Sequence, residues 1–106
     1  MLAKPHPSKE FLRLVFDYDK DRGLLLWRDH IVARRKRTAF PGSAAGTIDC
    51  AGYRAIVIGG GGAGFRSSRL IWIWHHGDIQ DGLQIDHING VRDDDRIENL
   101  RAVRTE

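Results

Sequence analysis

The chain has 106 residues, of which 42% are hydrophobic and 29% charged, and this length and composition indicate one small soluble domain. Its single cysteine, Cys50, excludes an internal disulfide and any zinc site built from several cysteines. No apolar run approaches the ~20 residues that a membrane-spanning helix needs. We therefore expect a cytoplasmic protein without a membrane partner.

The formal net charge of +3 conceals two regions of opposite charge. Residues 28–69 contain eight lysines and arginines against two acids, whereas residues 78–98 contain seven acids against two arginines. A basic region attracts a polyanion, and an acidic region can concentrate a divalent cation. Uneven decoration of a solvated surface explains the same pattern equally well, so charge alone leaves both interpretations open.

The first predicted elements are a short helix and a strand. Residues 1–9 form a loose lead-in that carries two prolines, and the apolar residues from Lys9 to Phe16 then suit an amphipathic helix capped by Ser8. Residues 17–23 predict a polar turn, and residues 24–27 predict a short apolar strand.

The middle of the chain combines a basic loop with a hairpin. Residues 28–46 show little periodicity and predict a long surface loop, in which the basic run 34–37 favours phosphate contact over a solvated face or a localisation signal. Residues 52–58 are rich in β-branched side chains and predict a strand. Glycines between 59 and 64 then turn the chain toward a second strand near Phe65.

A helix and a second hairpin are expected after this point. A serine, Ser67 or Ser68, is expected to cap a helix that Gly77 stops. Residues 84–88 predict a strand, the Asn89-Gly90 pair a tight turn, and residues 99–103 the returning strand.

Asp86 and His87 close the predicted strand at 84–88, and Asn99 follows twelve residues after the histidine. Side chains alternate along a strand, so the aspartate and the histidine face opposite ways unless the strand bends there. With a bend, the carboxylate could hold a hard cation while the imidazole acts as a base on water, and phosphodiester hydrolysis needs both. On spacing alone, a histidine that is merely hydrogen-bonded at a turn is an equal alternative.

The segment 85–90, Ile-Asp-His-Ile-Asn-Gly, followed by the segment 94–101, Asp-Asp-Arg-Ile-Glu-Asn-Leu-Arg, resembles HNH homing endonucleases of the phage and intron type. The resemblance extends in order over about residues 16–105. It implies an α+β fold: a small β-hairpin-rich domain with one central helix and a C-terminal ββα-metal finger that lacks its final helix. In this interpretation residues 1–15 are the lead-in and short helix, and residues 16–106 are a single domain. Its β-rich DNA-binding part is 16–77, and its HNH finger is 78–106.

The resemblance also implies metal-dependent hydrolysis of DNA, in a bacterial host cell if a phage encodes the protein. It makes Asp86 a metal ligand, His87 the general base, and Asn99 the residue that orients the histidine or supports its loop. The implied cofactor is one divalent ion, Mg²⁺ or Mn²⁺, and the implied partner is DNA. The residues expected to contact DNA are Arg34, Arg35, Lys36, Arg37, Arg54, Arg66, Arg69, Arg96 and Arg101.

The sequence departs from this family pattern at three places. Ser68 stands where a histidine is usual, and Asp95 stands where an asparagine is usual. The helix that carries the last metal ligand of the family would place that ligand just beyond Glu106. We therefore expect either a shortened enzyme or weak or lost nuclease activity. A DNA- or protein-binding module without catalytic turnover is the alternative.

Overall fold

The computed structural model describes residues 6–28, 42–58 and 64–105. The basic run 34–37, most of the predicted loop at 28–46, and most of the predicted glycine turn lie outside the described residues.

The N-terminal part is a helix followed by a hairpin. Helix α1 (Lys9–Val15) begins at Ser8, whose Oγ accepts a hydrogen bond of 3.1 Å from the backbone N–H of Phe11, which confirms the predicted cap. Strands β1 (Phe16–Asp19) and β2 (Leu24–Trp27) pair antiparallel. The predicted turn at 17–23 is therefore too long. Asp17 to Asp19 belong to strand β1. Their polar side chains suggested a turn in the sequence, but the strand is anchored by Phe16 at its start, which is fully buried.

The middle part is a three-stranded antiparallel sheet of order β3-β4-β5, built from β3 (Thr47–Ile48), β4 (Arg54–Ile56) and β5 (Phe65–Arg66). The strand near Phe65 is confirmed. The strand predicted at 52–58 is shorter than expected, because β3 and β5 each offer β4 only two paired residues.

Helix α3 (Ser67–His76) follows β5 directly, and it ends at Gly77, whose φ of 91° suits glycine. The predicted serine cap is wrong: the N-cap is Arg66, and no side chain caps this end. Ser67 and Ser68 lie inside the first turn and are buried, because the strand runs straight into the helix and carries them into the interior.

The C-terminal part is a hairpin of β6 (Leu83–His87) and β7 (Leu100–Arg104), in which Asp86 lies opposite Arg101 and His87 opposite Leu100. The short 3-10 helix η1 (Ile97–Asn99) precedes β7. Both strands and the turn at Asn89 and Gly90 are confirmed, but Asn99 lies in η1 and not in the returning strand.

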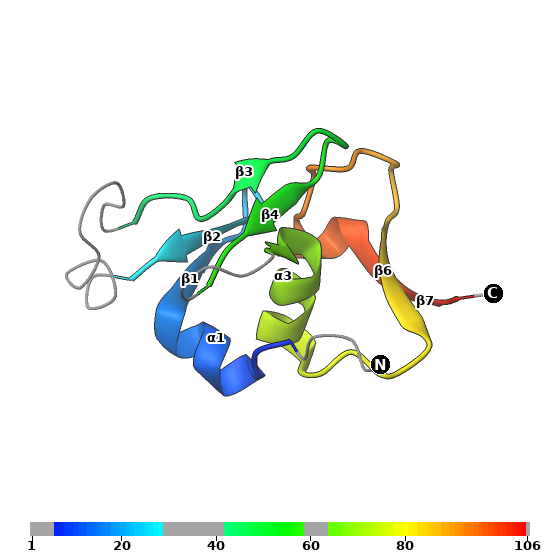
Figure 1. Cartoon of the computed structure of the whole chain (residues 1–106), viewed down its shortest axis with the longest axis horizontal. Helices are drawn as coiled ribbons and strands as arrows, with labels where there is room; N and C mark the ends of the chain where they lie inside the picture. The colour runs from blue at the N-terminus through cyan, green and yellow to red at the C-terminus, as the bar shows by residue number, and fades with distance from the viewer. Residues whose placement is uncertain (1–5, 29–41, 59–63, 106) are drawn as a thin grey trace.

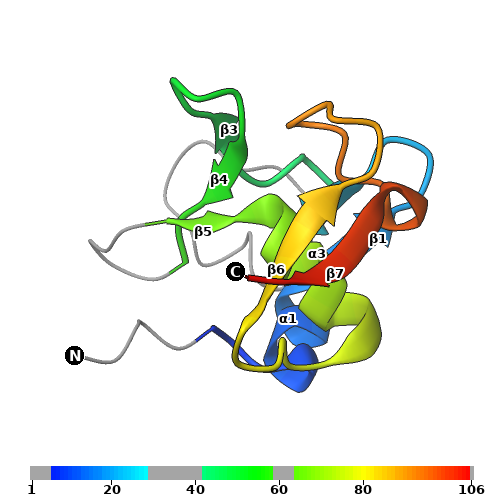
Figure 2. The ribbon, with the colours of Figure 1, turned by 90° about the vertical axis from the view of Figure 1, so that its right-hand side faces the viewer.

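Helix α3 lies between α1 and the β6–β7 hairpin (Figure 1), and the hairpin crosses in front of α3 in the rotated view (Figure 2). The described part of the chain is thus α+β, with two helices and three small antiparallel sheets. No helix in these ranges is long and apolar enough to cross a membrane. One core takes side chains from all three parts of the chain: Leu12, Val15, Phe16, Leu25, Trp27, Ala45, Ile56, Phe65, Leu70, Ile71, Ile73 and Leu100.

Candidate active site

Asp86 and His87 line the same pocket, which has a volume of about 160 Å³. Side chains alternate along a strand, and the lining takes four consecutive residues of β6, from Gln84 to His87, so both residues contribute to it although they are neighbours. The pocket is formed by the β6–β7 hairpin, the start of α3 and the ends of β4 and β5. Its lining residues are Tyr53, Arg66, Ser68, Arg69, Gln84, Ile85, Asp86, His87 and Val103.

Asp86 is held by its cross-strand neighbour. Arg101 donates from Nε to Oδ2 of Asp86 at 3.0 Å, and its Nη2 lies 2.9 Å from the same oxygen. The Asp86 side chain is 45% exposed, and its other oxygen, Oδ1, has no hydrogen-bond partner among the described residues. One carboxylate oxygen of this half-exposed side chain is therefore left without a protein partner among the described residues.

This donor set suits a hard divalent ion. Mg²⁺ keeps several waters in proteins and is commonly held by one or two carboxylates together with substrate phosphates. Asp86 supplies one such carboxylate, so it fits a site completed by water and phosphate oxygens. Within the described ranges, no three His, Cys, Asp or Glu side chains are grouped to hold an ion by themselves.

His87 is buried and contacts a buried carboxylate. Its Nε2 lies 2.6 Å from Oδ1 of Asp95, which is only 1% exposed. A carboxylate can only accept, so a neutral imidazole in this pair donates from Nε2. Burial raises the pKa of Asp95 above its ordinary value, while the contact with His87 and the charge of Arg54 act in the opposite direction. The second ring nitrogen, Nδ1, has no hydrogen-bond partner in the described part of the chain.

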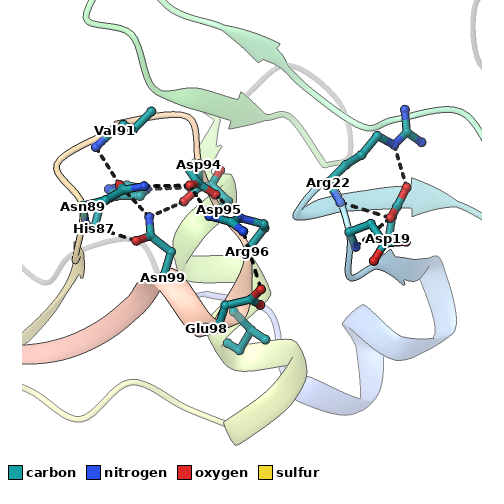
Figure 3. A network of polar contacts seen from close by, with 12 residues as sticks. Asp19, Arg22, His87, Asn89, Val91, Asp94, Asp95, Arg96, Glu98 and Asn99 are labelled. Atoms are coloured by element: carbon teal, nitrogen blue, oxygen red, sulfur yellow. Dashed lines mark hydrogen bonds and ion pairs between the residues drawn. The ribbon is translucent and has the colours of Figure 1, made fainter.

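The loop between β6 and η1 is held by the side chain of Asn99 (Figure 3). Its Oδ1 accepts from the backbone N–H of Asn89 at 3.1 Å, and its Nδ2 donates to Oδ1 of Asn89 and to the carbonyl of Asp94, both at 2.9 Å. These bonds tie both ends of the loop together. Asn99 therefore supports the loop that carries Asp95, and its side-chain bonds go to that loop and not to the imidazole.

The two acids that precede Asp95, Asp93 and Asp94, differ in their hydrogen bonding and exposure. Asp94 accepts from Nε and Nη2 of Arg96 at 2.7 and 2.8 Å, and from Nδ2 of Asn89 at 2.8 Å. The hydrogen bonds to the Arg96 guanidinium are the main reason that the pKa of Asp94 lies well below its ordinary value. Asp93 is exposed. Of these three consecutive acids, Asp94 holds the loop, Asp95 contacts His87, and Asp93 is solvated.

The predicted DNA-contact residues fall into three groups. Arg66 and Arg69 line the pocket, and Arg101 is not in the lining but pairs with Asp86, which is. Arg54 donates to the carbonyl of Gly46 at 2.9 Å, and Arg96 pairs with Asp94, so both have partners inside the molecule. The remaining candidates are outside the described residues: Arg34, Arg35, Lys36 and Arg37. Contact of any of these residues with DNA stays a prediction.

Two features of the site were not predicted. Asp95, which is not among the pocket-lining residues, was noted as a departure from the family's asparagine and not as a partner of His87, and that departure was itself the available signal. Tyr53 was considered only as part of a strand, but the guanidinium of Arg66 lies 3.7 Å from the centre of its ring, and that of Arg92 lies 5.3 Å away. The Tyr53 ring centre is 6.1 Å from that of His87. A stacked tyrosine carries no sequence signal that separates it from a core tyrosine.

A comparison with protein families supports a class for this site. Residues 66–106 match the family model described as HNH endonuclease, and this segment contains α3, β6, η1 and β7. The match covers less than half of the chain. It supports the HNH family and suggests nuclease function, and a DNA substrate and a divalent metal are what that family generally implies. It does not distinguish the phage and intron homing type, which stays a prediction. No curated protein and no solved structure shows a significant match.

Proposed function

We propose that this protein hydrolyses phosphodiester bonds of DNA, with Asp86 holding one Mg²⁺ or Mn²⁺ and His87 acting as the general base. The observation that carries the proposal is the common pocket, whose lining includes Asp86, His87, Arg66 and Arg69. Hydrolysis of a phosphodiester needs a carboxylate that can hold a hard cation, a base that can take a proton from water, and positive charge near the phosphate.

The side chains divide the reaction between them. A divalent ion bound at Asp86 would offset the negative charge that develops on the phosphoryl group. His87 takes a proton from a water molecule while the water oxygen forms a bond to phosphorus. The bond from phosphorus to the leaving oxygen breaks, and that oxygen takes a proton from solvent. Arg66 and Arg69 hold the non-bridging phosphate oxygens and so orient the phosphorus for attack.

The phage and intron homing type, and a cytoplasmic location, are further parts of this proposal that rest on the sequence alone. The motif over residues 85–101 supports the former, and the single cysteine supports the latter.

The test is conversion of supercoiled plasmid to nicked or linear DNA by the full chain, with Mg²⁺ and separately with Mn²⁺. We expect His87→Ala to lose at least about a hundredfold in rate, as removal of a general base does. His76→Ala is the matched control, because His76 is exposed at the end of α3 and outside the pocket lining. Unchanged nicking by His87→Ala would refute the mechanism.

A second function is favoured by the ion pair of Asp86 with Arg101, which occupies one oxygen of the proposed metal ligand. It is a DNA-binding module that keeps the scaffold without turnover. Salt-sensitive DNA binding, with no metal-dependent nicking by the wild-type chain in either ion, would establish it in place of the nuclease.

A further inference from the structure

We propose that Asp95 is a positioning residue that holds the His87 imidazole with its proton on Nε2, so that Nδ1 is the nitrogen that receives the proton from water. This inference rests on the proposed function and names the atom through which the base works. Its foundation is the 2.6 Å contact between His87 Nε2 and Asp95 Oδ1.

The contact is protected from solvent. The His87 and Asp95 side chains are 8% and 2% exposed, so water competes little for either partner. Hydrogen bonds to charged groups are stronger than neutral ones, and the surrounding low dielectric strengthens them further. The ring orientation is therefore fixed by the carboxylate.

The backbone behind Asp95 is fixed as well. Gly23, at the β1–β2 turn, lies so close that a Cβ added there would come within 2.6 Å of the carbonyl carbon of Asp95. The backbone N–H of Ile97 donates to the hydroxyl of Tyr18 at 2.8 Å. Contacts from a different hairpin thus hold the Asp95 segment, which gives the carboxylate little freedom to follow the imidazole elsewhere.

A carboxylate at position 95 determines which nitrogen of the neutral His87 imidazole carries the proton, whereas an amide would not. Asparagine, the residue usual here in the resembling family, can present either its oxygen or its NH₂ group to an imidazole nitrogen. Aspartate presents only acceptors, so it selects the Nε2-protonated form of a neutral imidazole. A carboxylate on the far nitrogen fixes the tautomer and stabilises the imidazolium formed during proton transfer. Nδ1, which has no hydrogen-bond partner among the described residues, is then the basic nitrogen.

The first test does not depend on activity. In ¹⁵N-labelled wild-type protein at about pH 8, above the ordinary imidazole pKa, long-range ¹H–¹⁵N correlations distinguish a protonated from an unprotonated ring nitrogen. We expect the proton of His87 on Nε2, and its exchange with water to be faster in Asp95→Asn than in wild type. A proton on Nδ1 in the wild-type protein, or unchanged exchange in the variant, would overturn the inference.

The second test is kinetic and compares Asp95→Asn with Asp93→Asn, an exposed acid two residues away. We expect kcat for nicking to fall by about 10- to 100-fold in Asp95→Asn, with KM within about twofold of wild type, because Asp95 is buried and acts through His87. Asp93→Asn should retain the wild-type kcat. Equal kcat in both variants, each shown to be folded by thermal unfolding, contradicts the inference.

The outcomes separate this inference from the proposed function. Nicking that is lost in His87→Ala but unchanged in Asp95→Asn removes the role of Asp95 and leaves the nuclease intact. Nicking that is unchanged in His87→Ala removes the nuclease mechanism, and the inference about its base is lost with it.

Discussion

Arg101 and Asp86 form an ion pair across the β6–β7 hairpin, with Nη2 of the arginine 2.9 Å from Oδ2 of the aspartate. The pair is at once a cross-strand contact of the hairpin and a competitor for the proposed metal ligand. The two side chains are 57% and 45% exposed, so the pair contributes little to stability, and its separation costs little.

We expect Arg101→Gln to bind Mn²⁺ more tightly than wild type in the absence of DNA, by at most about fivefold, because an exposed ion pair contributes about 1 kcal/mol or less. Isothermal titration with Mn²⁺ measures this. The control is Arg104→Gln, which removes an exposed arginine of the same strand that lies opposite Leu83. Weaker binding in Arg101→Gln alone would show that the arginine helps to hold the cation site and does not compete for it.

We expect Gly23→Ala to destabilise the protein by about 2–4 kcal/mol, since the added methyl would collide with the backbone of Asp95 and Arg96 and since φ is +68°. Gly82→Ala is the matched control, with φ of +85° and no atom within 4 Å of the added Cβ, so it carries the backbone cost alone. The free energy of unfolding in urea measures both. Equal losses in the two variants would show that the contact of Gly23 with the Asp95 segment is not tight.

Asn99→Ala should lower the free energy of unfolding by about 2–4 kcal/mol, because three hydrogen bonds of a buried amide are lost and their partners are left unsatisfied. Urea unfolding of the variant is compared with that of Gln80→Ala, an exposed polar residue that precedes β6. A variant as stable as wild type that fails to nick DNA would instead give Asn99 a direct part in catalysis.

The ion pair of Asp94 with Arg96 predicts a pH dependence of stability. The pKa of Asp94 is lowered from its ordinary value of 3.8, chiefly by the Arg96 side chain, so the ionised carboxylate stabilises the folded chain above about pH 4. This contribution is lost as the pH falls below that value toward the folded-state pKa. We expect Asp94→Asn to be less stable than wild type at neutral pH, and the difference to shrink in urea titrations below about pH 4. A difference that stays constant over that range would refute the assignment.

DNA binding should depend on the two pocket arginines. We expect Arg66→Gln and Arg69→Gln each to reduce the slope of log K against log salt by about 0.9, the value for one phosphate contact on duplex DNA. Fluorescence anisotropy with a labelled duplex at several salt concentrations measures the slope. Arg22→Gln is the control, because Arg22 lies at the β1–β2 turn and pairs with Asp19 at 2.6 Å. An equal change in the control would mean that the pocket does not face the phosphates.

Much of the secondary structure followed from local signals. Ser8 caps α1, Gly77 ends α3, and the Asn89-Gly90 turn joins the strand that carries His87 to the loop before η1. Each of these signals acts over a few neighbouring residues, which is why the sequence shows them. The serine cap at 67–68 failed for the opposite reason. The position of those serines is decided by packing of α3 onto the sheet, and they are buried in the interior.

The features of the candidate site likewise fall into those that local sequence signals predict and those that depend on tertiary contacts. The sequence by itself determined that Asp86 and His87 are adjacent near the end of a strand before a tight turn, because strand and turn propensities are local. Only the tertiary structure decided that both line a pocket with Arg66 and Arg69, that Arg101 lies on the aspartate, and that Asp95 holds the imidazole. The register of the β6–β7 hairpin places Arg101 opposite Asp86, and the loop before η1 brings Asp95 to His87. A hydrogen bond between side chains that meet through packing has no signature in the order of the residues.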